Sequence, residues 1–332
     1  MKGRLLLLVF ATFSAASQIR GQIQYPANTK NAALRYWIAF AEMQDVSTDK
    51  STEELLSKTL SGELPWDAEK LTPLLDANRT GIEIMQRATK LPDCDWGLEY
   101  SQGPRTSIAY VPRARALSRL NTLEGIRQLA SGDTQSAVNT WLAGIRFSQD
   151  LARGGSLVPA LMAKAALLPN LHELTTATSS GKLTASQQKQ VLAAVRALPQ
   201  DGFDWGAAWG IESATIEQFL HELQAASDPR ASYETAMRSP APKQGLPPTS
   251  QDIQTYLIYM RAVQSALREP PEKAKNTLGA LESKRAALNE LEQSVTPNPQ
   301  KSNLVRIEIM QARTELLQAL TKASVRPPVS FK

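Results

Sequence analysis

The strongest constraint on the fold is a stretch from Pro112 to Ala152 that carries two helical patterns joined by a short turn. Pro112 suits the first turn of a helix because an N–H there would have no partner within the helix. Ser131-Gly132-Asp133 suits the end of one helix and the capped start of the next. In the second pattern, apolar residues keep the i, i+3, i+4, i+7 spacing of one buried face: Val138, Trp141, Leu142 and Ile145. We therefore predict a helical hairpin over this stretch.

Small residues and one aromatic within this hairpin resemble the packing positions of a tetratricopeptide hairpin: Gly125, Gly132, Ala137, Trp141 and Gly144. Small residues let two helices approach closely, and one large ring fills the gap between them. The resemblance covers about one hairpin, Gln128 stands where the family has an aromatic, and no period of about 34 residues is found. It implies tetratricopeptide-like packing, with convergent packing of an ordinary helix hairpin as the alternative.

A longer pattern is similar to that of a group of uncharacterised exported bacterial proteins. It consists of a Leu-Pro…Asp-Trp-Gly turn, the segment Arg115–Leu120 and Ala130-Ser-Gly-Asp133. This resemblance spans about residues 70–220. It implies an all-helical fold and no particular activity.

The rest of the chain also favours helices, since aromatic residues make up only 6% and runs typical of strands are scarce. We predict an all-α fold of stacked antiparallel helical hairpins, tetratricopeptide-like or α-solenoid-like. We expect a helical-hairpin array over 22–238 and a C-terminal helical segment over 251–325, which ends in a hairpin of helices 272–293 and 300–322. Residues 239–250 contain four prolines, which predicts a linker. We predict a flexible tail over residues 326–332.

Two further helices are predicted from their apolar residues. In the helix expected over 31–44, one face carries Leu34, Trp37, Ile38 and Ala41. The helix that begins at Leu157 is apolar nearly all round, which is typical of a helix in the interior.

Residues 1–21 predict an export signal. Lys2 and Arg4 precede the apolar run 5–13, and Ala15-Ala16-Ser17 offers small residues for cleavage. An uncleaved membrane anchor is the alternative, although the run is shorter than the ~20 residues that a span requires. We therefore expect a periplasmic or secreted protein without a transmembrane segment after signal removal.

Charge and cysteine content exclude several classes of protein. Removing Lys2, Arg4 and Arg20 with the signal takes 37 basic residues to 34, against 32 acidic residues, which leaves a net charge of +2. A nearly neutral chain gives no reason to expect nucleic acid as a partner. Cys94 is the only cysteine, which excludes an internal disulfide and a multi-cysteine metal site.

Few motifs point to chemistry. The sequence has no Gly-x-Ser-x-Gly nucleophile turn, phosphate-binding loop, dinucleotide fingerprint or His-Glu-x-x-His motif. The two histidines lie in Leu-His-Glu-Leu segments, His172-Glu173 and His221-Glu222, which would form a metal site if their helices faced each other. Histidines at helix boundaries are the favoured alternative, so we predict neither a metal nor a cofactor.

A helix, a Leu-Pro stop and an Asp-Trp-Gly turn occur twice, around residues 91–97 and 198–206. The repeat suggests either a duplicated unit or, as we favour, a shared way of ending a helix. If the turns converged, Asp95, Asp204 and Glu212 would be candidates for a general acid and base. Binding candidates are the tryptophans beside them, which could stack on a sugar ring or cover an apolar joint: Trp96, Trp205 and Trp209.

Two functions follow as hypotheses. The first, which we favour over an enzyme, is an exported helical scaffold that binds another protein or peptide of the cell envelope, because stacked hairpins present extended surfaces. The second is a hydrolase of cell-wall or carbohydrate material that uses the three acids.

Overall fold

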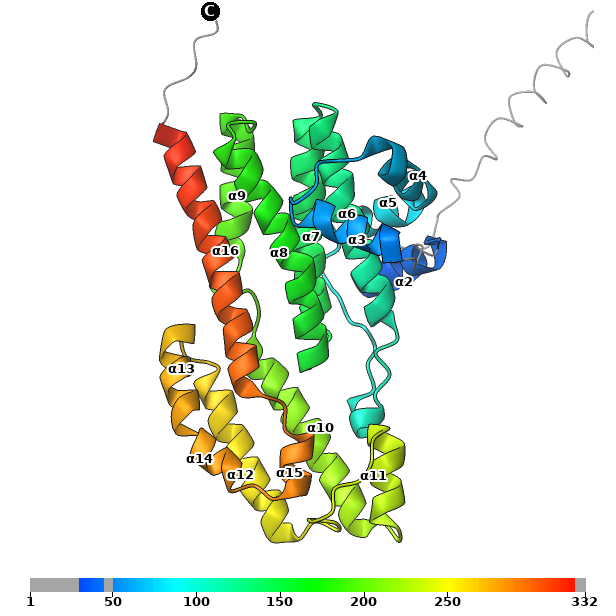
Figure 1. Cartoon of the computed structure of the whole chain (residues 1–332), viewed down its shortest axis with the longest axis vertical. Helices are drawn as coiled ribbons and strands as arrows, with labels where there is room; N and C mark the ends of the chain where they lie inside the picture. Colours follow the sequence, from blue (N-terminus) through cyan, green and yellow to red (C-terminus); the bar gives the residue numbers. More distant parts are fainter. Residues whose placement is uncertain (1–29, 45–49, 326–332) are drawn as a thin grey trace, which may run out of the picture. The chain divides into compact units, whose positions relative to one another are not determined.

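The computed structural model describes residues 30–44 and 50–325 (Figure 1). The predicted signal over 1–21 and the tail over 326–332 lie outside them. The described residues form fifteen α-helices and one 3-10 helix, and no strand occurs among them apart from an isolated bridge between Asn31 and Asp93. The all-α prediction is therefore confirmed. The helices are α2 (Ala32–Glu42), α3 (Lys50–Leu60), α4 (Ala68–Ala77), α5 (Arg79–Ala88), η1 (Tyr100–Arg105), α6 (Tyr110–Ala130), α7 (Thr134–Ala152), α8 (Leu157–Ser179), α9 (Ala185–Ala197), α10 (Trp205–Ala225), α11 (Pro229–Met237), α12 (Ser250–Ala266), α13 (Pro271–Ala280), α14 (Glu282–Ala286), α15 (Glu290–Val295) and α16 (Pro299–Val325).

The predicted hairpin is formed by α6 and α7, which pack side by side and leave α7 in contact with α8 (Figure 1). Its turn is built as expected, because Gly132 adopts φ +86° and Asp133 accepts the Ser136 N–H at 3.0 Å. A Cβ at Gly125 would come within 2.2 Å of the buried Trp141 ring. The small residue therefore sets how closely the two helices approach.

The C-terminal helix α16 packs along α8 and also contacts α9 and α13. Lys164 on α8 pairs with Glu308 on α16 at 2.7 Å. The prediction of one continuous helix over 272–293 is wrong, because this segment forms three helices, α13, α14 and α15. Asn289 starts α15 with a capping box, in which its side chain accepts the Glu292 N–H and Glu292 accepts the Asn289 N–H. This cap is incompatible with a continuous helix.

The face of α2 that we predicted to be buried is exposed instead. Leu34, Trp37 and Ile38 are 52%, 41% and 43% exposed. The opposite stripe is buried and consists of small and aromatic residues: Ala32, Ala33, Tyr36, Ala39, Phe40 and Met43. This stripe is the buried one because α2 lies against α5 at Gly81. A Cβ added to Gly81 would be only 3.1 Å from the Ala39 carbonyl oxygen.

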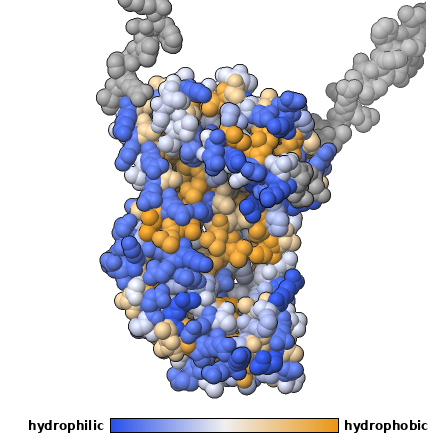
Figure 2. All heavy atoms as spheres, viewed as in Figure 1, coloured by the Kyte–Doolittle hydropathy of each residue, from blue (hydrophilic) through white to orange (hydrophobic). Residues whose placement is uncertain are grey.

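The prediction that α8 is wholly interior is also wrong at its start. Val158 and Leu161 are each 43% exposed, and Leu304 on the neighbouring α16 is 57% exposed. Figure 2 shows apolar residues gathered across the middle of this face, over α8 and α16. In the part of the chain that the structure describes, no helix is both long enough and apolar enough to cross a membrane.

Candidate functional site

A pocket of about 520 Å³ lies between α7, the end of α9 and the start of α10. We call it the α7–α9 pocket. Its walls are mostly apolar, with two arginines, one glutamine and one acid among them. The lining residues are Leu142, Ile145, Arg146, Gln149, Ala152, Arg153, Gly155, Ala160, Ala194, Ala197, Leu198, Pro199, Phe203, Asp204, Ala207 and Ala208.

The pocket is hollow because small side chains face it from four helices. Alanines occupy positions where a leucine would fill the space, on α7, α8, α9 and α10: Ala152, Ala160, Ala194, Ala197, Ala207 and Ala208. The turn between α9 and α10 is held against α7, since Gln149 donates to the Gly202 carbonyl at 3.3 Å. Asp204 caps α10 by accepting the Ala207 N–H at 2.8 Å. The helix ends around the hollow are therefore fixed by the fold.

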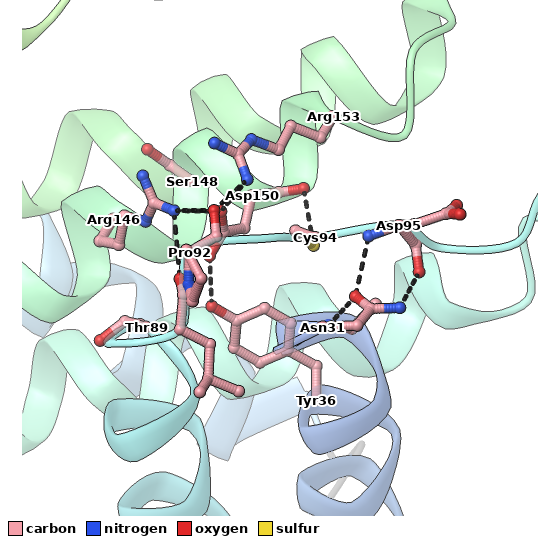
Figure 3. Close-up of polar contacts among 12 residues, drawn as sticks. Asn31, Tyr36, Thr89, Pro92, Cys94, Asp95, Arg146, Ser148, Asp150 and Arg153 are labelled. Carbon is pink, nitrogen blue, oxygen red and sulfur yellow. Dashed lines mark hydrogen bonds and ion pairs between the residues drawn. The ribbon is translucent and has the colours of Figure 1, made fainter. Parts of the chain in front are cut away.

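Next to the pocket, α7 carries a buried carboxylate between two arginines (Figure 3). The Asp150 side chain is fully buried, and its Oδ2 accepts a hydrogen bond from the Tyr36 hydroxyl at 2.7 Å. Its Oδ1 lies 3.3 Å from Arg146 Nη2 and 3.7 Å from Arg153 Nη1. We call these four residues the Asp150 cluster. It links α2 to α7 through a single carboxylate.

The two arginines also hold the first Leu-Pro segment. Arg153 donates to the Pro92 carbonyl at 3.1 Å, and Arg146 makes longer contacts with the Leu91 and Pro92 carbonyls at 3.4 and 3.5 Å. Each arginine therefore joins a buried acid to an irregular segment of backbone.

Burial governs the ionisation of this region. It raises the pKa of Asp150, while the hydrogen bond from Tyr36 and the two guanidinium charges lower it in part. Burial, followed by the nearby Asp150 charge, raises the pKa of the Tyr36 hydroxyl and raises that of the Cys94 thiol to about 12. A thiol with so high a pKa stays protonated at neutral pH and is a poor nucleophile. Cys94 instead donates a weak hydrogen bond to the Asp150 carbonyl at 3.6 Å.

The three acids proposed as catalytic candidates have separate partners. Asp95 accepts the Gly97 N–H at 2.9 Å, Asp204 caps α10, and Glu212 accepts the Leu157 N–H at 3.4 Å. Burial raises the pKa of Glu212. Of the three, only Asp204 lines the α7–α9 pocket. Each acid thus completes a turn or a helix start.

The three tryptophans proposed as binding candidates lie in the core. Trp96, Trp205 and Trp209 are 5%, 1% and 0% exposed. Trp96 stacks on the Tyr110 ring at a centroid distance of 4.2 Å and donates from its indole to the Asp150 carbonyl at 2.8 Å. Of the two roles considered for these rings, their burial fits the covering of apolar joints.

The two His-Glu pairs are not brought together as a metal site. Among the described residues, no group of three or more His, Cys, Asp or Glu side chains is placed to hold a metal ion. Glu222 pairs instead with Arg105 at 2.8 Å. Glu173 is buried on α8, and this burial raises its pKa to about 7.

The Asp150 cluster was missed at the level of sequence, although a signal was present. Arg146, Asp150 and Arg153 follow the i, i+4, i+7 spacing, which places them on one side of a helix. An acid between two arginines on one side of a helix indicates an ion pair. Its partner Tyr36, 114 residues earlier in the chain, gives no comparable signal.

Searches with protein-family models, among curated proteins and among solved structures gave no match.

Proposed function

We propose that this chain is an exported helical protein that binds a segment of another cell-envelope polypeptide in the α7–α9 pocket. The supporting observation is the pocket itself, about 520 Å³ in volume and lined mainly by apolar side chains with a few polar groups. Sites that take an organic group commonly have roughly 300–1,000 Å³ and this mixture of walls. Export rests on the sequence pattern of residues 1–21.

The helical frame supports binding without large rearrangement. α7 forms one wall of the pocket, and it is fixed by close packing on both neighbours. A Cβ at Gly125 would meet Trp141, and a Cβ at Gly144 would lie 2.5 Å from the Asn170 side chain. A wall fixed in this way preserves the hollow in the free protein, which lowers the cost of ordering on binding. We further propose that α6 and α7 pack in the tetratricopeptide-like manner that the sequence resemblance implies.

The test is a pocket-filling substitution. A soluble library of dye-labelled synthetic peptides, each with an apolar residue in varied flanking sequence and with free ends, is screened against the mature chain by fluorescence anisotropy. For the peptides that bind, Ala197→Trp should weaken binding at least about tenfold, because the indole occupies the hollow.

Ala193→Trp is the matched control. Ala193 lies on α9, is exposed, and does not line the pocket. This variant should bind as the unaltered chain does. A library without a binding peptide, or equal loss in the two variants, would contradict the proposal.

A further inference from the structure

We infer that the polypeptide segment taken by the α7–α9 pocket carries a carboxylate next to its apolar side chain, and that Arg146 and Arg153 bind this carboxylate. The inference rests on the proposed function and specifies the chemistry of the ligand. Both arginines line the pocket, and the rest of its wall is predominantly apolar.

Each arginine has more hydrogen-bond donors than it uses within the described structure. A guanidinium group has five N–H donors on three nitrogens. Arg146 makes all of its contacts through Nη2, and Arg153 makes all of its contacts through Nη1. Figure 3 shows each guanidinium approaching Asp150 with one nitrogen while its other nitrogens point away. In the described structure, two nitrogens of each arginine therefore have no protein acceptor.

The Asp150 cluster carries more positive than negative charge. The cluster has two guanidinium charges and one buried carboxylate, so it keeps an excess of positive charge even with Asp150 ionised. The one acid in the pocket wall, Asp204, caps α10 through its Oδ1 and forms no ion pair with either arginine in the described structure, although its own negative charge offsets part of the excess. A carboxylate beside the arginines would compensate the excess. A planar guanidinium also matches a carboxylate in shape.

The two arginines are accessible from the pocket, whereas Asp150 is not. The side chains of Arg146 and Arg153 are 35% and 42% exposed, whereas that of Asp150 is 0% exposed. A ligand therefore reaches the arginines from the pocket, and the buried acid stays out of its reach. Asp150 and Tyr36 act as positioning residues that hold the guanidinium groups in place from behind.

Polypeptides carry carboxylates on Asp and Glu side chains and at the C-terminus, and the experiment distinguishes these sources. Peptides whose binding is weakened by Ala197→Trp are synthesised in matched forms. In one pair of forms Asp or Glu is replaced by Asn or Gln, and in the other the C-terminus is an acid or an amide. Loss of the recognised carboxylate should weaken binding about tenfold or more, since hydrogen bonds to charged groups are the stronger ones. Whichever replacement causes the loss identifies the source.

The variant arm uses Arg153→Gln, with Arg153→Lys to retain a charge beside Asp150. Arg153→Gln should weaken binding of the carboxylate peptide about tenfold and leave its amide counterpart unchanged. Arg153→Lys should give an intermediate loss, because an ammonium group lacks the planar fork. Circular dichroism confirms that each variant is folded.

One arm requires no variant. With the unaltered chain, raising the salt concentration should weaken the carboxylate peptide more than its amide form. Equal binding of the two forms at all salt concentrations would overturn this inference while the proposed function stands. If no peptide shows the loss on Ala197→Trp, the proposed function fails, and this inference fails with it.

Discussion

The two Leu-Pro…Asp-Trp-Gly segments share a sequence pattern but differ in structure. The first, residues 91–97, is an irregular connection in which Asp95 forms a local turn and Gly97 adopts φ +64°. The second, residues 198–206, opens a helix, because Asp204 is the N-cap of α10 and Gly206 lies within it. The common feature is a helix that ends at or shortly before Leu-Pro, followed by an aspartate that accepts a nearby N–H.

The tryptophans of the two segments show the difference most clearly. The Trp96 indole donates to the Asp150 carbonyl, 54 residues away in sequence, at 2.8 Å in a buried site. The Trp205 indole donates to the Asp201 carbonyl, four residues away, at 3.0 Å in a partly buried site. The first segment is thus tied to the Asp150 cluster, and the second is stabilised locally. A repeated sequence pattern does not imply a repeated environment.

The largest effect should come from removing the aspartate on which the first segment depends. Asp150→Ala leaves the Tyr36 hydroxyl and two arginines without their shared acceptor, and it should lower the free energy of unfolding by about 3–5 kcal/mol. Asp204→Ala removes only a helix cap and should cost about 1 kcal/mol. Urea unfolding followed by circular dichroism measures both. Equal losses would mean that the two segments are anchored to a similar degree.

Measuring the free energy of unfolding at several pH values separates these effects from the titration of Glu173, which lies in neither segment. Burial raises the pKa of Glu173 from 4.5 to about 7, so the folded chain binds this proton more tightly than the unfolded chain does. Its favourable contribution is present below pH 4.5 and is lost as the pH rises towards about 7. Glu173→Gln should therefore raise the free energy of unfolding at pH 8 by up to about 3 kcal/mol and have little effect at pH 4.

Glu83→Gln, which replaces an exposed glutamate on α5, is the control for that series. A stability difference between Glu173→Gln and the unaltered chain that did not change with pH would contradict the assignment.

The two indole hydrogen bonds can be compared directly. Trp96→Phe and Trp205→Phe each remove an indole N–H and similar volume from the core. Trp96→Phe should destabilise the chain by about 1 kcal/mol more, because it leaves the Asp150 carbonyl with only the weak Cys94 thiol as a donor. Thermal unfolding of the pair tests this. A larger loss for Trp205→Phe would reverse the comparison.

The smallest effect on stability is expected from alanine substitution of the glycines at the ends of the two segments, Gly97 and Gly206. Gly97→Ala places a side chain at positive φ, where nothing lies within 4 Å, and should cost about 1 kcal/mol through backbone strain alone. Gly206→Ala places a Cβ 2.5 Å from Cγ of the exposed Arg268, so the Arg268 side chain has to change its χ1 angle to make room. The higher helix propensity of alanine offsets this movement, so we expect a change within about 0.5 kcal/mol in chemical denaturation. A cost for Gly206→Ala equal to that for Gly97→Ala would remove the distinction between loop and helix.

Local features were predicted because their causes lie within a few residues. Asp133 caps α7, as its position after Gly132 indicated. Trp141 is buried against α6, as its spacing indicated. The candidate site was only partly predicted: Asp204 was named for its turn and does line the pocket, while the arginines were missed.

The sequence by itself determined that this chain is helical, where many of its helices begin and end, and that α6 and α7 pair, since capping and helical periodicity act over one or two turns. Only the tertiary structure decided which stripe of α2 is buried, because α2 carries two apolar stripes and the close approach at Gly81 selects one of them. It alone brought Tyr36 to Asp150 and left a hollow among alanines from four helices. Such contacts depend on how helices distant in sequence fit together, which no local pattern encodes.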